Sequence, residues 1–323
     1  MRANLHLHSR YSDGVFWPMD IVQMAKASGL ELIALTDHDN LAGNEEFIDA
    51  CEKEEIKGIR GVEIDCIGTF SLDERSNRNI IYDSEILGYF PCGTYSRTQE
   101  LLTPVIQTRK KKMEHYLNCA RKIFNDENIT WIDFETFHKE ETDEDPEERI
   151  FTYMKPHLFD YLKYKEILDK NMEFGTFQDV YFADNSNKNL ADGLEKNYEK
   201  LSIEKVVESI KKDKGFAVIP HLAQRFIPKD RRSVPKRLFP SLEERRCIYQ
   251  AFLNFCKDLG VWGVEIYQYH FRDDQKNIID CLNSYIREIA NGQFNFTYGS
   301  DFHGRYSPSD TLGEFYGEFK GFV

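Results

Sequence analysis

Short apolar runs rich in Leu, Ile and Val alternate along the chain with longer stretches of helical periodicity. This alternation is typical of strands that are each followed by a helix, the repeating unit of α/β barrels. The runs predict seven strands, at residues 2–7, 31–36, 57–66, 80–90, 216–220, 262–267 and 294–299.

Residues typical of helix ends stand between these runs. The segment 18–29 begins with proline and ends with glycine, as helices commonly do. A second helix is predicted from Ser202 to Lys214, with acidic residues first and basic residues last, as the helix dipole favours. A third is predicted from Ser241, which opens a capping-box pattern, to Gly260. The helix signals therefore agree with the strand pattern.

The alternation of strands and helices is interrupted between residues 96 and 200. Helical patterns and segments rich in Phe, Tyr and Lys replace it, and the acidic run 140–148 predicts a solvated loop. We therefore predict a barrel domain formed by residues 1–95 and 201–323, with an inserted, mainly helical subdomain at 96–200. A basic, proline-broken stretch at 228–237 predicts a surface loop after the fifth strand.

The composition is that of a folded, soluble protein of 323 residues with a net charge of −13. Hydrophobic residues make up 41% of the chain, enough for a core. No membrane span or secretory signal is recognisable, so we expect a cytoplasmic protein without a membrane partner. The 7 cysteines form no CxxC pair, which argues against a disulfide framework and a thiolate zinc site. The acidic balance argues against broad, non-specific binding of nucleic acid.

Residues that can bind metal ions stand at or near the end of every predicted strand. Because the carboxyl ends of parallel strands meet at one rim of a barrel, we expect these side chains to lie together. The alternative is that they are ordinary polar residues with one hydrogen-bond partner each, which requires six of the 9 histidines to fall at strand ends by chance. In chain order the residues are His6, His8, Asp37, His38, Asp39, Glu63, Glu85, His221, His270, Asp301 and His303.

The residue types of this set indicate the kind of ion. Imidazole and carboxylate ligands suit Mn, Fe or Zn, with Mg also compatible, and the lack of cysteine argues against a structural zinc site. Residues two apart on a strand point to the same side, so His6 and His8 can share one ion. Asp301 and His303 repeat this spacing near the end of the chain. The set is too large for one ion and predicts two or three divalent cations.

At these positions the sequence resembles the polymerase and histidinol phosphatase (PHP) superfamily of metallophosphoesterases. The resemblance implies an α/β fold, a distorted seven-stranded (β/α)7 barrel of PHP type with a mainly helical insertion. Within the superfamily, the stretches Lys155-Pro156-His157-Leu158 and Gly175-Thr176-Phe177 are most similar to the nucleoside 3′,5′-bisphosphate phosphatase branch. The matching motifs are Leu5-His6-Leu7-His8-Ser9 with Asp13-Gly14, Leu35-Thr36-Asp37-His38-Asp39, Gly61-Val62-Glu63-Ile64, Ile86-Leu87-Gly88-Tyr89, Val218-Ile219-Pro220-His221, Gly263-Val264-Glu265-Ile266-Tyr267 and Gly299-Ser300-Asp301-Phe302-His303-Gly304.

The resemblance also implies a set of ligands for each ion. One ion would take His6, His8, Glu63 and Asp301. A second would share Glu63 with His221, and a third would take Asp13, His38 and His303.

Two positions depart from the family pattern. Glu85 stands where the family usually has histidine, and a carboxylate favours harder ions such as Mn, Mg or Fe. The fifth strand has Pro220 before His221, where the family usually has the histidine before a proline. Both departures concern the second ion, whose site is the least well defined by the sequence.

Other polar residues have candidate roles near a phosphate. Arg225 can clamp phosphate in a bidentate manner, and Lys155 can assist from the insertion, unless both are ordinary surface residues. His270 can act as leaving-group acid or phosphate donor, or be only a polar residue at the rim. Asp37 and Asp39 are expected to fix imidazole tautomers, and Glu265 is interpreted as structural. We expect His115 and His138 at the surface, and His157 either capping a helix or facing the pocket.

The resulting prediction is a metal-dependent phosphoesterase, EC class 3.1.3, that hydrolyses a phosphomonoester of a nucleotide-like substrate, such as a 3′,5′-bisphosphate, by a metal-bridging hydroxide. One alternative is a 5′-3′ exonuclease on short RNA or DNA that uses the basic loop, including Arg231 and Arg232. Others are a histidinol-phosphate-like phosphatase, an amidohydrolase, which the Gly-Ser-Asp-Phe-His ending fits poorly, and a non-catalytic, metal-stabilised binding module. The sequence does not define the oligomeric state.

Overall fold

The computed structural model describes residues 1–72, 79–142, 149–183, 186–194, 200–225, 242–267, 273–305, 312–313 and 317–322. Side chains of 242–244 and 273–278 are not described. Within the described residues, no helix has the length and apolar character needed to cross a bilayer.

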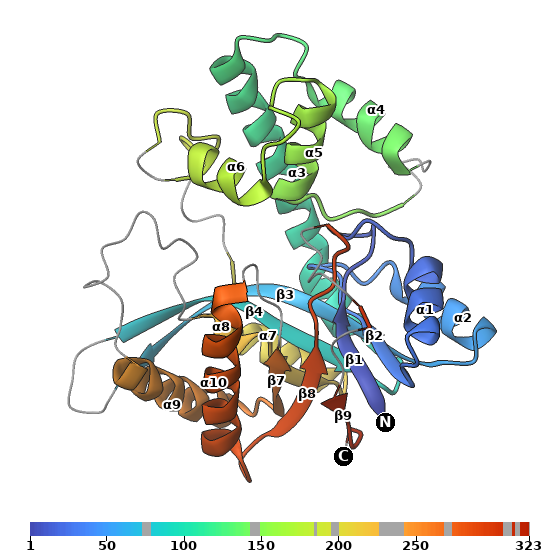
Figure 1. The fold of residues 1–323 in the computed structure, drawn as a ribbon, viewed down its shortest axis with the longest axis vertical. Coiled ribbons are helices and arrows are strands. Elements are labelled where there is room, and N and C mark those ends of the chain that lie inside the picture. The colour runs from blue at the N-terminus through green and yellow to red at the C-terminus, as the bar shows by residue number, and fades with distance from the viewer. Residues whose placement is uncertain are drawn as a thin grey trace.

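A single twisted sheet forms the centre of the molecule (Figure 1). Its strands lie in the order β8-β7-β6-β4-β3-β2-β1-β9, and β5 pairs with β3. The sheet curls until its two sides meet, since the backbone beside Leu7 pairs with Phe302 just after β8. The strands are β1 (Arg2–Leu7), β2 (Leu32–Leu35), β3 (Lys57–Ser71), β4 (Asn79–Phe90), β5 (Leu201–Ser202), β6 (Phe216–Ile219), β7 (Gly263–Tyr267), β8 (Asn295–Gly299) and β9 (Gly317–Glu318).

The seven predicted strands are all present, and they form a nearly closed α/β barrel, so the predicted fold class is confirmed. The short strands β5 and β9 were not predicted. Each has only two residues, which is too short for a hydrophobic pattern to reveal.

The assumption that all seven strands run parallel is wrong at β4. This strand is antiparallel to both β3 and β6, and it pairs with β3 over a long hairpin from Arg60↔Phe90 to Ser71↔Asn79. Glu85 therefore does not stand at the carboxyl end of a parallel strand. It lies opposite Asp65, two residues beyond Glu63, and residues at these positions share one face of the sheet. Glu85 reaches the same rim by strand pairing.

Helices cover the outside of the sheet and pack against it to form hydrophobic cores. α7 packs on β3, β4 and β6, while α9 contacts β3 and α10 contacts β7. Ser202 accepts a hydrogen bond from the backbone N–H of Lys205 and so caps α7, as its sequence position predicts. The barrel helices are α1 (Pro18–Ala27), α2 (Asn44–Lys53), α7 (Ile203–Lys212), α8 (Leu222–Arg225), α9 (Leu242–Leu259) and α10 (Asp273–Ala290).

The segment between β4 and β5 is helical in its described residues and lies at one end of the molecule (Figure 1). It has its own buried cluster, in which Phe134, Tyr161 and Phe177 are nearly inaccessible to solvent. Trp17 of the barrel packs against this cluster. The helices are α3 (Ser96–Phe124), α4 (Trp131–Thr142), α5 (Lys155–Tyr164) and α6 (Phe174–Tyr181). The segment thus stands beside the rim of the barrel that bears the candidate site.

Candidate metal centre

Buried histidines and carboxylates gather at the rim of the barrel where β1, β2, β6 and β8 end. They form three overlapping groups in which possible ligand atoms lie within 4.8 Å of one another. Group A contains His6, His8, Glu63 and Asp301; group B contains His8, Asp13, His38 and His303; group C contains Glu63, Glu85 and His221. All the metal ligands predicted from the sequence are therefore brought together.

Group A is built by β1, β3 and the segment that follows β8. His6 Nε2 lies 3.2 Å from Glu63 Oε2 and 3.2 Å from Asp301 Oδ1. His8 Nε2 lies 3.3 Å from the same Glu63 oxygen and 3.0 Å from the same Asp301 oxygen. Two imidazole nitrogens and two carboxylate oxygens thus surround one point.

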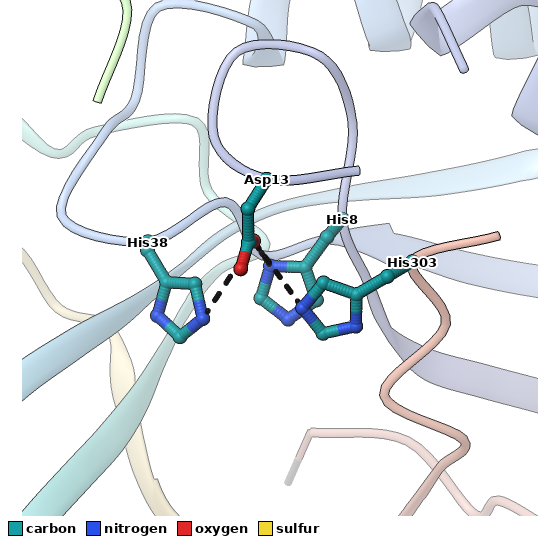
Figure 2. A group of neighbouring side chains, drawn as sticks. All are labelled: His8, Asp13, His38 and His303. Atoms are coloured by element: carbon teal, nitrogen blue, oxygen red, sulfur yellow. Dashed lines mark ion pairs between the residues drawn. The ribbon is translucent and has the colours of Figure 1, made fainter. Parts of the chain in front are cut away.

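Group B is centred on the carboxylate of Asp13. Asp13 belongs to the loop after β1, and its side chain lies between the histidine rings (Figure 2). Asp13 Oδ1 lies 3.2 Å from His303 Nε2, 3.8 Å from His38 Nε2 and 3.9 Å from His8 Nδ1. A neutral imidazole has one lone pair for an ion, so His8, whose Nε2 faces group A, is assigned to group A. Asp13, His38 and His303 then remain for group B.

Group C has fewer donors and contains a basic neighbour. His221 Nε2 lies 3.0 Å from Glu63 Oε1 and 3.8 Å from Glu85 Oε2. Arg225 Nη2 donates to the same Glu85 oxygen, so the predicted phosphate ligand lies beside the cluster.

Charge at the cluster is shared between buried carboxylates and imidazoles. Burial opposes protonation of His6, but Glu265, Glu63 and Asp301 outweigh it and hold the pKa of His6 well above its usual value. Burial also opposes protonation of His8, and its hydrogen bonds to Asp301 and Glu63 raise its pKa to about 10. Burial favours the neutral form of Glu63, yet His6 and His38 keep its pKa well below the ordinary range. The cluster therefore favours positive charge at its centre, and cations must displace protons to bind.

Two observations show that the residues fit divalent cations. Bonds of about 2.0–2.1 Å place neighbouring ligand atoms roughly 3.0–3.4 Å apart, depending on coordination number. The contacts of 3.0 to 3.3 Å in group A match this spacing. In addition, buried atoms that face the cluster lack a hydrogen-bond partner within the described part of the chain: His6 Nε2, His8 Nδ1, Asp13 Oδ1 and His38 Nδ1.

Glu265 on β7, interpreted from the sequence as structural, supports two residues of the cluster, and these partners were not predicted. Its carboxylate lies 3.0 Å from His6 Nδ1 and accepts a hydrogen bond of 2.8 Å from the backbone N–H of His221. The first contact directs His6 Nε2 toward group A, and the second holds the left-handed backbone of His221, with φ of 31°. Its place in the motif Gly-Val-Glu-Ile-Tyr was a signal, but the partners of a strand residue depend on the fold.

The prediction that Asp37 and Asp39 fix imidazole tautomers is wrong. Asp37 accepts hydrogen bonds from Ser9 and Ser12 and so shapes the loop that carries Asp13. Asp39 instead binds Arg109.

Asp39 adopts a left-handed backbone with φ of 51° and accepts hydrogen bonds of 3.0 and 2.6 Å from Arg109 of α3. Arg109 Nη2 also lies 2.5 Å from Asp65 Oδ2 on β3. The insertion is thereby tied to the segment that holds His38. Arg109 was not predicted, because it begins a basic run that is typical of a solvated helix face.

Two further predictions concern substrate binding. Lys155 begins α5 of the insertion. Its Nζ lies 4.3 Å from the centre of the Phe182 ring, which belongs to the same segment. His270 and the basic stretch 228–237, with Arg231 and Arg232, lie outside the described residues.

Three histidines of the insertion have other surroundings. His138 is only 3% exposed, so its predicted surface position is wrong. His157 Nδ1 accepts a hydrogen bond of 2.9 Å from the backbone N–H of Met154 and so caps α5, one of the two predicted possibilities. His115 on α3 is half-buried and lies 2.8 Å from the carbonyl of Asp192.

Arg305 was not predicted either. It donates to the carbonyl oxygen of Asp13 and forms an ion pair with Asp160 of α5. It thus joins the loop of group B to the insertion.

Sequence comparisons identify relatives that match about a fifth of the chain. One match is a 5'-3' exoribonuclease of Haemophilus influenzae, 46% identical over 63 residues that cover 20% of this chain and 23% of the relative. Another is a 3',5'-nucleoside bisphosphate phosphatase of Chromobacterium violaceum, 41% identical over 61 residues that cover 19% of this chain and 21% of the relative. Each alignment spans less than a quarter of the relative's own length.

Solved structures resemble the fold over nearly the whole chain. A protein of Bifidobacterium adolescentis assigned as a metal-dependent phosphoesterase aligns with a TM-score of 0.62 and 21% identity, covering 97% of this chain and 91% of its own. A Chromobacterium violaceum structure described as an amidohydrolase with bound sulfate aligns with a TM-score of 0.60 and 22% identity, covering 98% of this chain and 91% of its own. The family model described as the PHP domain matches residues 4–208. The chain therefore belongs to the PHP domain family.

Proposed function

We propose that the protein is a metal-dependent phosphoesterase that hydrolyses a phosphomonoester of a nucleotide-like substrate, for instance a 3′,5′-bisphosphate. The observation that carries the proposal is the sharing of ligands between neighbouring groups. Glu63 belongs to groups A and C, and His8 faces both A and B, so cations held there would be close neighbours. Adjacent divalent ions are a common arrangement for phosphoryl transfer.

The ligand set indicates which residues would hold ions and what the ions would supply. Group A and the residues Asp13, His38 and His303 of group B offer imidazole and carboxylate donors, which suit Mn, Fe or Zn. Divalent ions bound there would lower the pKa of water and stabilise negative charge on phosphoryl oxygens. No serine or cysteine nucleophile is then required.

The protein's own residues would orient the substrate and support the ligands. Arg225 lies beside group C and has a planar set of donors that matches phosphate oxygens. Glu265 keeps Nε2 of His6 directed toward group A, and Asp37 holds the loop of Asp13. These contacts fix the site before the substrate arrives, so little reorganisation is needed during the reaction. We retain His270 as the proposed leaving-group acid.

The test is release of inorganic phosphate by protein loaded with Mn²⁺. The substrates are a nucleoside 3′,5′-bisphosphate, nucleoside monophosphates and histidinol phosphate. Asp301→Asn should lower turnover by at least about 100-fold, because it removes a group A ligand. The matched control Asp83→Asn changes an exposed carboxylate on β4 and should leave turnover within about twofold of the parent protein. Lack of turnover on all substrates, with bound metal verified, would contradict the proposal.

A 5′-3′ exonuclease is the second candidate, supported by the similarity to the Haemophilus influenzae exoribonuclease. Short oligonucleotides with a 5′-phosphate test it directly. Replacing Arg231 and Arg232 by Gln should then weaken oligonucleotide cleavage and spare mononucleotides. Equal loss on both substrates would argue against the exonuclease.

A further inference from the structure

We propose that Arg225 replaces a third cation, so that the protein binds two divalent ions, in groups A and B, with the guanidinium in group C. The number of ions follows from the ligands alone. The additional role of Arg225, as the third positive charge beside a phosphoryl group, rests on the proposed function.

The three groups differ in the donor atoms that they offer to an ion. Group A has four donor atoms with contacts of 3.0 to 3.3 Å. Group B has three donors of its own, with His8 as a fourth neighbour. Group C has only three donors, one of which belongs to Glu63, whose other oxygen faces group A. An ion in group C would therefore have the weakest set of ligands.

The Glu85 oxygen that faces His221 already has two hydrogen-bond donors. Glu85 Oε2 accepts a hydrogen bond of 2.6 Å from Ser84 Oγ, and it also accepts one from Arg225 Nη2. The same oxygen lies 3.8 Å from His221 Nε2. Two donors satisfy the two lone pairs of a carboxylate oxygen. This oxygen is already engaged within the protein, and an ion would have to displace Arg225 to use it.

Arg225 places a permanent positive charge beside group C. Its guanidinium stays protonated throughout the physiological pH range, and its side chain is 18% exposed. It follows His221 by one turn of α8, and its contact with Glu85 holds the guanidinium beside group C. A divalent ion in group C would meet this fixed positive charge at close range.

One hydrogen-bond donor of Arg225 remains available. Arg225 Nε is buried and has no hydrogen-bond partner among the described residues. A buried donor of this kind is costly unless a ligand satisfies it. A phosphoryl oxygen beside group C would accept from it, and Glu85 would keep the guanidinium in place. The charge would then be present at any metal concentration.

The test is Mn²⁺ binding to the full chain, measured by equilibrium dialysis with metal analysis. We expect two tightly bound ions in the parent protein and in Arg225→Lys, which keeps the charge. Arg225→Met should gain a third ion, with a Kd at least roughly tenfold lower than any third site of the parent protein. The control Lys200→Met removes a neighbouring cation that pairs with Asp65 and Asp83, and it should still bind two.

Glu85→Gln provides a second variant in case Arg225→Met does not fold. It keeps Arg225 charged, so it should also bind two ions. The proposal would be overturned if the parent protein bound three ions of similar affinity and Glu85→Gln bound two. It would also be overturned if a folded Arg225→Met protein bound only two ions. Because binding is measured without turnover, these outcomes remain informative if no phosphoesterase activity is found.

Discussion

Replacing Arg109 by Met should destabilise the protein and weaken group B together. The guanidinium is 12% exposed and forms close ion pairs with Asp39, which is fully buried, and with Asp65. Removing one member of a buried ion pair costs about 3–5 kcal/mol, because the remaining charge is left without a partner. Asp65 keeps Lys200 at 3.7 Å, so the loss falls mainly on Asp39, and we expect about 3 kcal/mol. At roughly 2 °C per kcal/mol, Tm should fall by about 6 °C.

The assay is thermal unfolding of the parent protein, Arg109→Met and the control Arg97→Met. Arg97 lies on the same helix, but its ion pair with Glu100 is exposed, so its loss should cost about 0–1 kcal/mol. Adding Asp39→Asn to Arg109→Met should recover part of the stability, because the buried charge is removed. Since Asp39 adjoins His38, Mn²⁺ affinity at group B should also fall by about 10–100-fold. An Arg109→Met protein as stable as Arg97→Met would refute this reasoning.

Three further predictions address other parts of the structure. Burial, reinforced by nearby positive groups, lowers the pKa of His138 to about 3 and that of His157 to about 4. Below about pH 6.5 both histidines take up a proton when the protein unfolds. The free energy of unfolding should therefore decrease as the pH is lowered, by about 2 kcal/mol per residue between pH 7 and pH 5. A His138→Gln protein should lose about 2 kcal/mol less than the parent over this range, measured by urea unfolding, and equal losses would contradict the assignment. Gly299→Ala places a methyl group 2.1 Å from Glu265 Oε1 and 2.4 Å from His6 Cβ, so group A should bind Mn²⁺ about 10–100-fold more weakly. Gly175→Ala, with open space around it, should not change binding, and equal affinity in the two variants would argue against the role of Glu265. Removing metal with EDTA should lower Tm, since each ion at 100 times its Kd adds about 2.7 kcal/mol, and an unchanged Tm would contradict metal binding at the cluster.

The strands and the ligand cluster could be predicted because each has a local signature. An apolar run identifies a strand, and a His-x-His or Asp-x-His pair at its end places two donors on one side. His6 and His8 follow this rule, whereas Asp301 and His303 lie beyond the end of β8, where Asp301 has a left-handed backbone, and reach different groups. The resemblance to a known family supplied the connections among distant segments.

The remaining features depend on contacts that a local pattern does not contain. The direction of β4 follows from its hairpin with β3, and the same apolar run fits either direction. Asp37 and Asp39 flank His38, yet their partners are Ser9, Ser12 and Arg109, which come from other segments. His138 belongs to a polar stretch but is buried against aromatic rings of the insertion. A polar residue is expected at the surface, but tertiary packing can bury it among residues from other segments.

Anomalous scattering from crystals grown with Mn²⁺ tests the central claim most directly. We expect one peak among His6, His8, Glu63 and Asp301, and another among Asp13, His38 and His303. Mn²⁺ bound elsewhere in the crystal, with no peak at either place, would contradict the proposed metal centre.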